Sequence, residues 1–228
     1  MKILNLHKDD TGLIRQAAAL LVEGFKDTGS ASWPDMAAGL KEIEESLQPG
    51  RISLAAIDDT GEVVGWVSGI SEYDGNAWEL HGLVVKTEYR GRGIARALVA
   101  ELENQVMKSG GTTIYLGTDD ENCRTSVSGI DLYPDVLEKL ANIKNPGNHP
   151  FGFYQKVGFT VVGIIRTPTV SESRISSWLR GSGINKMSKT WTGDVECPVV
   201  QPRLLSNRFR KFPEEARDAC LIHFPLCC

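Results

Sequence analysis

The sequence predicts an α/β protein in which helices cover both faces of a mixed, mostly antiparallel sheet. Segments with apolar residues at helical spacing alternate with short β-branched runs, and a hairpin pattern at residues 52–70 precedes strands separated by helices. The chain has 228 residues and is 41% hydrophobic, which is enough for one sizeable core with little left for a second domain.

The first half of the chain contains two predicted helices and the hairpin. Residues 13–25 have apolar side chains at helical spacing, and Trp33-Pro34-Asp35 opens a second helix that runs to about residue 47, with proline near its first turn. The hairpin pairs residues 52–57 with residues 63–70 across an Asp- and Gly-containing turn.

The second half alternates strands and helices. The predicted strands are 78–85, 113–116 and 159–165, and the predicted helices are 94–107, 134–143 and 150–158. Gly110-Gly111 ends the long helix before the strand that follows.

Charge is distributed unevenly along the chain. Residues 1–165 carry 15 basic and 23 acidic side chains, whereas residues 166–228 carry 10 and 6. An acidic body argues against nucleic acid as the partner and suits a cationic small substrate, although it also serves solubility. No apolar run is long enough to span a bilayer, and the N-terminus lacks the apolar core of a secretory signal, so we expect a cytoplasmic protein without a membrane partner. The five cysteines show no zinc-like spacing, and we predict no metal site.

A Gly-rich basic loop follows the strand Trp78-Glu79-Leu80-His81-Gly82-Leu83-Val84-Val85 and opens a helix. The loop reads Arg90-Gly91-Arg92-Gly93-Ile94-Ala95. Glycine permits close backbone approach, free N–H groups at a helix start attract phosphate, and arginine adds charge-assisted bonds. The motif indicates a cradle for a pyrophosphate-bearing cofactor; alternatively, it is an ordinary helix entry with solvated arginines.

The R-x-x-G-x-A loop resembles the acetyl-CoA signature of the GNAT acetyltransferases. Together with WELHGLVV, TIYLGTDD (113–120), DLYP (131–134) and HPFGFYQKVGF (149–159), it resembles the aminoglycoside 6'-N-acetyltransferases of that superfamily over most of residues 1–165. The resemblance implies a sheet whose two central strands splay apart to admit the pantetheine arm. It further implies acetyl-CoA as acetyl donor, an aminoglycoside antibiotic as acceptor, antibiotic resistance, and a possible homodimer.

The resemblance also implies roles for individual residues. Backbone groups of Leu83, Val84 and Val85 would bind the pantetheine arm and polarise the thioester carbonyl. Glu79 would be the general base, directly or through a water, although a strand carboxylate is often only solvated. Tyr154 would protonate the departing thiolate, unless it is a packed tyrosine.

Four further residues are candidates for the aminoglycoside pocket beside Glu79. Amino sugars combine several ammonium groups with apolar ring faces, so carboxylates and aromatic rings suit them. The candidates are Trp33, Tyr73, Asp119 and Asp120. His81 shares the face of Glu79 and is expected to be a hydrogen-bonding partner in preference to a second base.

The resemblance stops at Arg166. The related enzymes end with a strand of the type PDANGxGKPDIFMAK, and inserting one base after the codon for Ile165 can restore that peptide. We therefore predict a body of residues 1–165 and an aberrant, poorly ordered tail of residues 166–228 that replaces the last strand and puts the homodimer in doubt. Two other functions stay open: acetylation of another small amine or a protein N-terminus, and a catalytically dead product that still binds acetyl-CoA.

Overall fold

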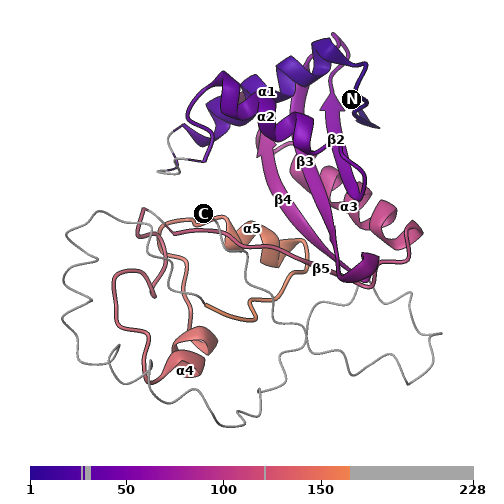
Figure 1. Cartoon of the computed structure of the whole chain (residues 1–228). Coiled ribbons are helices and arrows are strands. Elements are labelled where there is room, and N and C mark those ends of the chain that lie inside the picture. The colour runs from indigo at the N-terminus through magenta and orange to yellow at the C-terminus, as the bar shows by residue number, and fades with distance from the viewer. Residues whose placement is uncertain (27, 29–31, 121, 165–228) are drawn as a thin grey trace.

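A computed structural model describes residues 1–26, 28, 32–120 and 122–164. Its centre is a five-stranded sheet in the order β1-β2-β3-β4-β5 (Figure 1). The strands are β1 (Lys2–Asn5), β2 (Arg51–Ile57), β3 (Val63–Glu72), β4 (Ala77–Val85) and β5 (Thr113–Tyr115). The first four strands pair antiparallel, and β4 pairs parallel with β5. The mixed, mostly antiparallel sheet predicted from the sequence is confirmed.

Helices cover both faces of this sheet, as predicted. The helices are α1 (Thr11–Phe25), α2 (Met36–Glu45), α3 (Ile94–Lys108), α4 (Val136–Ala141) and α5 (Phe151–Lys156). Figure 1 shows α1 and α2 on one side of the sheet and α3 on the other. Each side has its own apolar core: α3 buries Leu98 and Leu102 on one face, and α1 packs Leu21 with Ile43 of α2 on the other.

Two predictions about strands were wrong. The sequence analysis missed β1, which is only four residues long and is held by its antiparallel pairing with β2. It also predicted a strand at 159–165, but residues 159–164 form no strand and Ile165 lies outside the described residues. A strand needs a neighbouring backbone for its hydrogen bonds, and no described strand pairs with this segment. The predicted tail likewise lies outside the described residues.

Glycine at position 82 makes a bulge in β4. The register with β3 shifts between Val67, opposite Leu83, and Ser68, opposite His81, so that Gly82 is the extra residue. Its φ of 62° lies in the left-handed region, and a Cβ there would stand 2.7 Å from a ring carbon of Trp66, which is fully buried.

The bulge changes which side of the sheet the residues of β4 face. Before it, Leu80 packs in the α3 core; after it, Val84 packs in the α1 core. Strict alternation would have put both side chains on the same face. Leu83 and Val85 consequently pack against the α3 core, and the strand ends in a different orientation from the one in which it began.

The two central strands separate after a short contact. The β4–β5 ladder covers only three pairs, from Ala77 opposite Thr113 to Glu79 opposite Tyr115. Beyond Glu79, β4 continues to Val85 and keeps β3 as its only ladder partner among the described strands. This divergence is the splayed centre expected from the sequence, and it begins at Glu79.

Candidate active site

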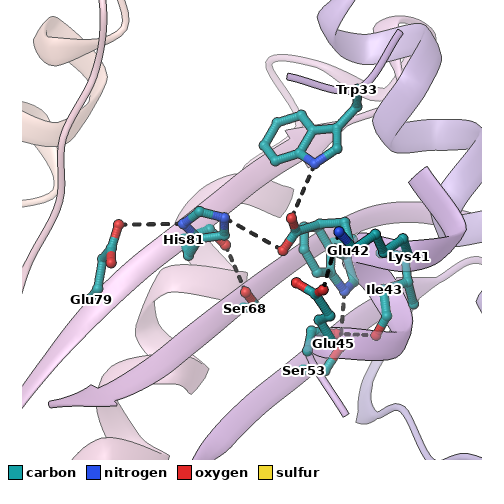
Figure 2. A network of polar contacts seen from close by, with 11 residues as sticks. Trp33, Lys41, Glu42, Ile43, Glu45, Ser53, Ser68, Glu79 and His81 are labelled. Carbon is teal, nitrogen blue, oxygen red and sulfur yellow. Dashed lines mark hydrogen bonds and ion pairs between the residues drawn. The ribbon is translucent and has the colours of Figure 1, made fainter. Parts of the chain in front are cut away.

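Glu79 stands where the two strands separate and belongs to a chain of polar contacts (Figure 2). Its Oε1 lies 3.3 Å from Nδ1 of His81, and Nε2 of His81 lies 3.4 Å from Oε1 of Glu42. The indole of Trp33 donates to Oε2 of Glu42 at 3.1 Å. The structure therefore joins the predicted residues Trp33 and Glu79 through His81 and Glu42.

His81 is positively charged in this arrangement. Both ring nitrogens face carboxylate oxygens, which only the doubly protonated imidazolium can satisfy. Glu42 first, and then Glu79, raise the pKa of His81 to about 10 against the opposing effect of burial. A group that already holds its proton at neutral pH cannot take another one, so His81 is not the general base of this site.

Backbone N–H groups of β4 face the gap beside β5. The N–H of Lys86 donates to the carbonyl of Val64 in β3 at 2.9 Å. Because successive backbone groups of a strand point to opposite edges, the N–H groups of Val85 and Leu83 point away from β3. Arg90 Nε reaches the carbonyl of Val85 on that same edge, at 3.2 Å. The predicted backbone donors of Leu83 and Val85 thus point away from β3, whereas the N–H of Val84, also predicted as a donor, points to β3, and its side chain is core.

The Gly-rich loop leaves the N-terminus of α3 open. Gly91 and Gly93 have φ of 76° and 84°, and a Cβ at either position would meet no atom within 4 Å. No side chain caps α3, and its first intrahelical bond is that of Ala97 to Gly93. The N–H groups of Ile94 and Ala95 therefore have no intrahelical acceptor. Open space, uncapped N–H groups and the positive end of the helix dipole fit a pyrophosphate.

Contacts within the protein hold the side chains around this loop. Tyr89 donates its hydroxyl to Asp58 Oδ2 at 2.7 Å, which ties the loop to the β2–β3 turn. The guanidinium of Arg92 lies 4.9 Å from the Tyr89 ring centroid, within cation–π range, while Arg90 is bonded to the β4 backbone. Arg92 is the arginine better placed for a charge-assisted bond to phosphate, because its guanidinium donors are not committed to a backbone carbonyl.

Tyr154 on α5 packs against the same apolar cluster as Leu83 and Val85. Its ring makes edge contacts with Phe153 and Phe159 at centroid distances of 5.2 and 5.8 Å. Burial raises its pKa to about 12, so it is a neutral phenol at physiological pH. As a neutral phenol it can donate a hydrogen bond through its hydroxyl.

The acidic loop after β5 is bound mainly to itself. Asp120 accepts bonds from the N–H groups of Arg124 at 2.6 Å and Thr125 at 2.9 Å, and from the Thr125 hydroxyl at 2.6 Å. Burial would raise its pKa, but these bonds outweigh burial and lower it. Asp119 is exposed, and its carbonyl accepts from His149 Nε2 at 2.8 Å. Of the two predicted residues, the Asp119 side chain is the more accessible to a cation.

The acidic loop is tied to the segment before Trp33, and Tyr73 lies at the end of β3. Asn122 donates to the carbonyl of Thr28 at 2.5 Å and so joins the acidic loop to the segment between α1 and Trp33. Tyr73 is exposed at the end of β3. Burial, followed by the negative charges of Glu79 and Glu72, raises the pKa of Tyr115 to about 12. Carboxylates from both β3 and β4 therefore lie near this residue of β5.

The sequence analysis missed Glu42. Its side chain is only 13% exposed, and α2 begins at a capping residue, Asp35, whose carboxylate accepts from the N–H of Ala38. In the sequence Glu42 is one of several acidic residues of an amphipathic helix. Nothing in the local pattern separates it from Glu44 and Glu45, which are exposed.

The chain is similar to acetyltransferases in sequence and in fold. The chain matches the "Acetyltransferase (GNAT) family" over residues 18–133. The chain belongs to this family. An aminoglycoside 6'-N-acetyltransferase crystallised with coenzyme A is 37% identical, has a TM-score of 0.67, and matches over 74% of this chain and 89% of its own. The aminoglycoside 6'-N-acetyltransferase from Enterococcus faecium is 38% identical, has a TM-score of 0.66 and matches over the same shares.

Curated relatives match over a shorter segment. An acetyltransferase of Photorhabdus laumondii is 37% identical over 84 residues, which are 37% of this chain and 57% of the relative. An acetyltransferase of Pectobacterium atrosepticum is 35% identical over 81 residues, or 36% of this chain and 56% of its own length. The chain thus spans little more than half of each curated relative. Among the described residues, no helix is long and apolar enough to cross a membrane, and no group of acidic, His and Cys side chains is placed to hold a metal.

Proposed function

We propose that the chain transfers an acetyl group from acetyl-CoA to the 6'-amino group of an aminoglycoside. The observation that carries this proposal is the carboxylate of Glu79 at the point where β4 and β5 separate, with Oε1 on the His81 cation and Oε2 without a protein partner among the described residues. Similarity to two aminoglycoside 6'-N-acetyltransferases supports the choice of acceptor. An acetylated amine loses the positive charge that attracts it to ribosomal RNA, so we expect the reaction to confer resistance.

Each residue of the site has its own part in the proposed acetyl transfer. Acetyl-CoA supplies an activated acetyl thioester, and the Gly91–Gly93 loop with the start of α3 fits its pyrophosphate. Glu79 binds the acceptor ammonium and takes its proton, which frees the nitrogen lone pair for attack on the carbonyl carbon. The N–H groups of Leu83 and Val85 bond the carbonyl oxygen as it gains negative charge. As the carbon–sulfur bond breaks, Tyr154 donates a hydrogen bond to the departing thiolate, and the second proton lost by the acetylated nitrogen passes to that sulfur, so that a neutral amide and the thiol of coenzyme A leave the site.

A pair of antibiotics tests the position of transfer. Neomycin and paromomycin differ in carrying an amine or a hydroxyl at the 6' position. We expect neomycin, incubated with the chain and acetyl-CoA, to gain one acetyl group by mass spectrometry and paromomycin to gain none. Equal acetylation of both would overturn the 6' assignment, and acetylation of neither, with spermidine or a peptide N-terminus modified instead, would favour the other-acceptor function.

The absence of a strand at residues 159–164 favours one alternative of a different class. A GNAT body without that strand can retain the cofactor cradle, which is built by β4 and α3, while losing catalysis. Coenzyme A binding by isothermal titration calorimetry without any acetylated product would identify such a catalytically dead product.

Replacing Tyr154 with Phe is expected to lower kcat about tenfold, because a hydrogen bond to a charged group contributes about 1.5 kcal/mol or more. KM for acetyl-CoA should change little, since the ring keeps its contacts with Phe153 and Phe159. Steady-state kinetics measure both constants, with Tyr133→Phe as the control because Tyr133 is exposed. An unchanged kcat in Tyr154→Phe would reduce this tyrosine to a packing role.

A further inference from the structure

A carboxylate from α2, that of Glu42, reaches His81 on β4, the strand that also carries Glu79. Glu42 Oε2 accepts from the Trp33 indole, and Oε1 lies 3.4 Å from His81 Nε2. That distance describes an ion pair and not a well-formed hydrogen bond, and Oε1 is buried with no hydrogen-bond partner among the described residues. A neutral amide would serve Trp33 equally well, so the indole alone does not account for a buried negative charge.

The charge acts on the His81 ring. His81 lies between Glu42 on α2 and Glu79 on its own strand, and turning the ring would break both contacts (Figure 2). On the β3 side, the Ser68 hydroxyl donates to the backbone carbonyl of His81 at 2.8 Å and fixes the strand there. The ring orientation is therefore set from α2, and it in turn sets which oxygen of Glu79 is engaged.

We propose that Glu42 is a positioning residue of the acetyl-transfer site, acting through the His81 cation to hold Glu79 with Oε1 engaged and Oε2 directed to the acceptor amine. The inference rests on the proposed function. Glu42 itself touches neither acceptor nor donor; it keeps His81 charged, and the charged ring keeps the catalytic carboxylate in one orientation.

The surrounding charges agree with this assignment. Burial raises the pKa of Glu42, but the contacts with His81 and Trp33 outweigh burial and lower it, so Glu42 is ionised. The groups that act on this pair from the packed elements are Arg51 of β2 on Glu42, and Glu79 of β4 on His81. Two carboxylates around one imidazolium leave one net negative charge, which attracts an ammonium acceptor. Without Glu42 the imidazole would hold its proton less tightly.

Glu42→Gln is the variant that tests this proposal, because it preserves shape and the acceptor for Trp33 and removes only the charge. In histidine-labelled protein, NMR titration should find His81 with a pKa well above 6.5 in the parent chain. The variant should lower that pKa by one unit or more. His81→Asn assigns the resonance among the four histidines, and Glu45→Gln on the same helix is the matched control.

The loss of kcat in Glu42→Gln is expected to grow as pH rises. Below the lowered pKa of the variant, His81 is still charged and kcat should approach that of the parent. Above it, the ring becomes neutral, so the ratio of parent to variant kcat should widen to about tenfold as pH rises through the lowered pKa of the variant. KM for acetyl-CoA should stay unchanged. A purely structural defect would lower kcat by the same factor at every pH.

Three results would overturn the proposal. They are a parent His81 that titrates near 6.5, a pKa unchanged in Glu42→Gln, and a kcat ratio independent of pH. If the parent chain acetylates no amine at all, the proposed function fails, and with it the catalytic role of Glu42. The NMR titration still reports separately whether Glu42 controls the charge of His81.

Discussion

Replacing Glu79 with Gln is expected to lower kcat for aminoglycoside acetylation by about 10² or more, the usual contribution of a general base. The amide keeps the size of the side chain, and its oxygen can still accept from His81 Nδ1. It can neither take a proton nor neutralise an ammonium. KM for the aminoglycoside should rise as well, whereas KM for acetyl-CoA should stay constant, because the cofactor cradle is built by the loop at Gly91–Gly93 and by α3.

The control for this variant is Glu23→Gln, an exposed carboxylate on α1. Kinetics of both variants across pH, with coenzyme A affinity measured in parallel, separate lost chemistry from lost binding. If Glu79→Gln turns over as fast as the parent chain, Glu79 is not the base, and the description of the site around it is wrong.

Gly82→Ala is expected to destabilise the protein by about 2–5 kcal/mol. Part of the cost, about 1–2 kcal/mol, comes from placing a Cβ at a φ of 62°. The rest comes from the contact of that Cβ with Trp66 at 2.7 Å, in a core where added volume costs about 1–3 kcal/mol. Because the bulge also orients the Leu83 and Val85 backbone, acetyl transfer should fall further than the stability loss explains.

Gly110→Ala is the matched control for the bulge. Gly110 has a φ of 86°, but a Cβ there meets no atom within 4 Å, so this variant carries the conformational cost without the clash. The free energies of unfolding in urea give the comparison. Equal destabilisation by the two substitutions would show that Trp66 tolerates the added methyl group and that the bulge is less constrained than its geometry indicates.

Local patterns predicted the body of the fold. Helical spacing located α1 and α3, and the hairpin turn located β2 and β3, because each of these elements buries one apolar face with its own period. The same alternation placed Glu79 and His81 on one face of β4. The prediction of a strand at 159–165 was wrong because apolar residues alone do not make a strand. A strand also needs a neighbouring strand for its backbone hydrogen bonds, and the sequence of this segment does not show whether one is present.

The candidate site was predictable only in part. The Gly-rich loop was predictable because glycines and arginines before a helix suit a phosphate, and Glu79 was found through the resemblance of its strand to the aminoglycoside 6'-N-acetyltransferases. Glu42 carried no such signal, since its role arises from the packing of α2 against β4. Asp120 was expected to bind a cation because it is a carboxylate, but it accepts hydrogen bonds from Thr125 of its own loop. Gly82 did carry a signal, since an isolated glycine within a strand often marks a bulge.

Mass spectrometry of kanamycin incubated with the full chain and acetyl-CoA tests the central claim most directly. A variant in which residues 166–228 are replaced by the PDANGxGKPDIFMAK-type ending runs beside it. We expect the chain to add one acetyl group to kanamycin. Product from the variant alone would mean that the body is an acetyltransferase disabled by its present ending, and no product from either chain would contradict the assignment of aminoglycoside acetylation.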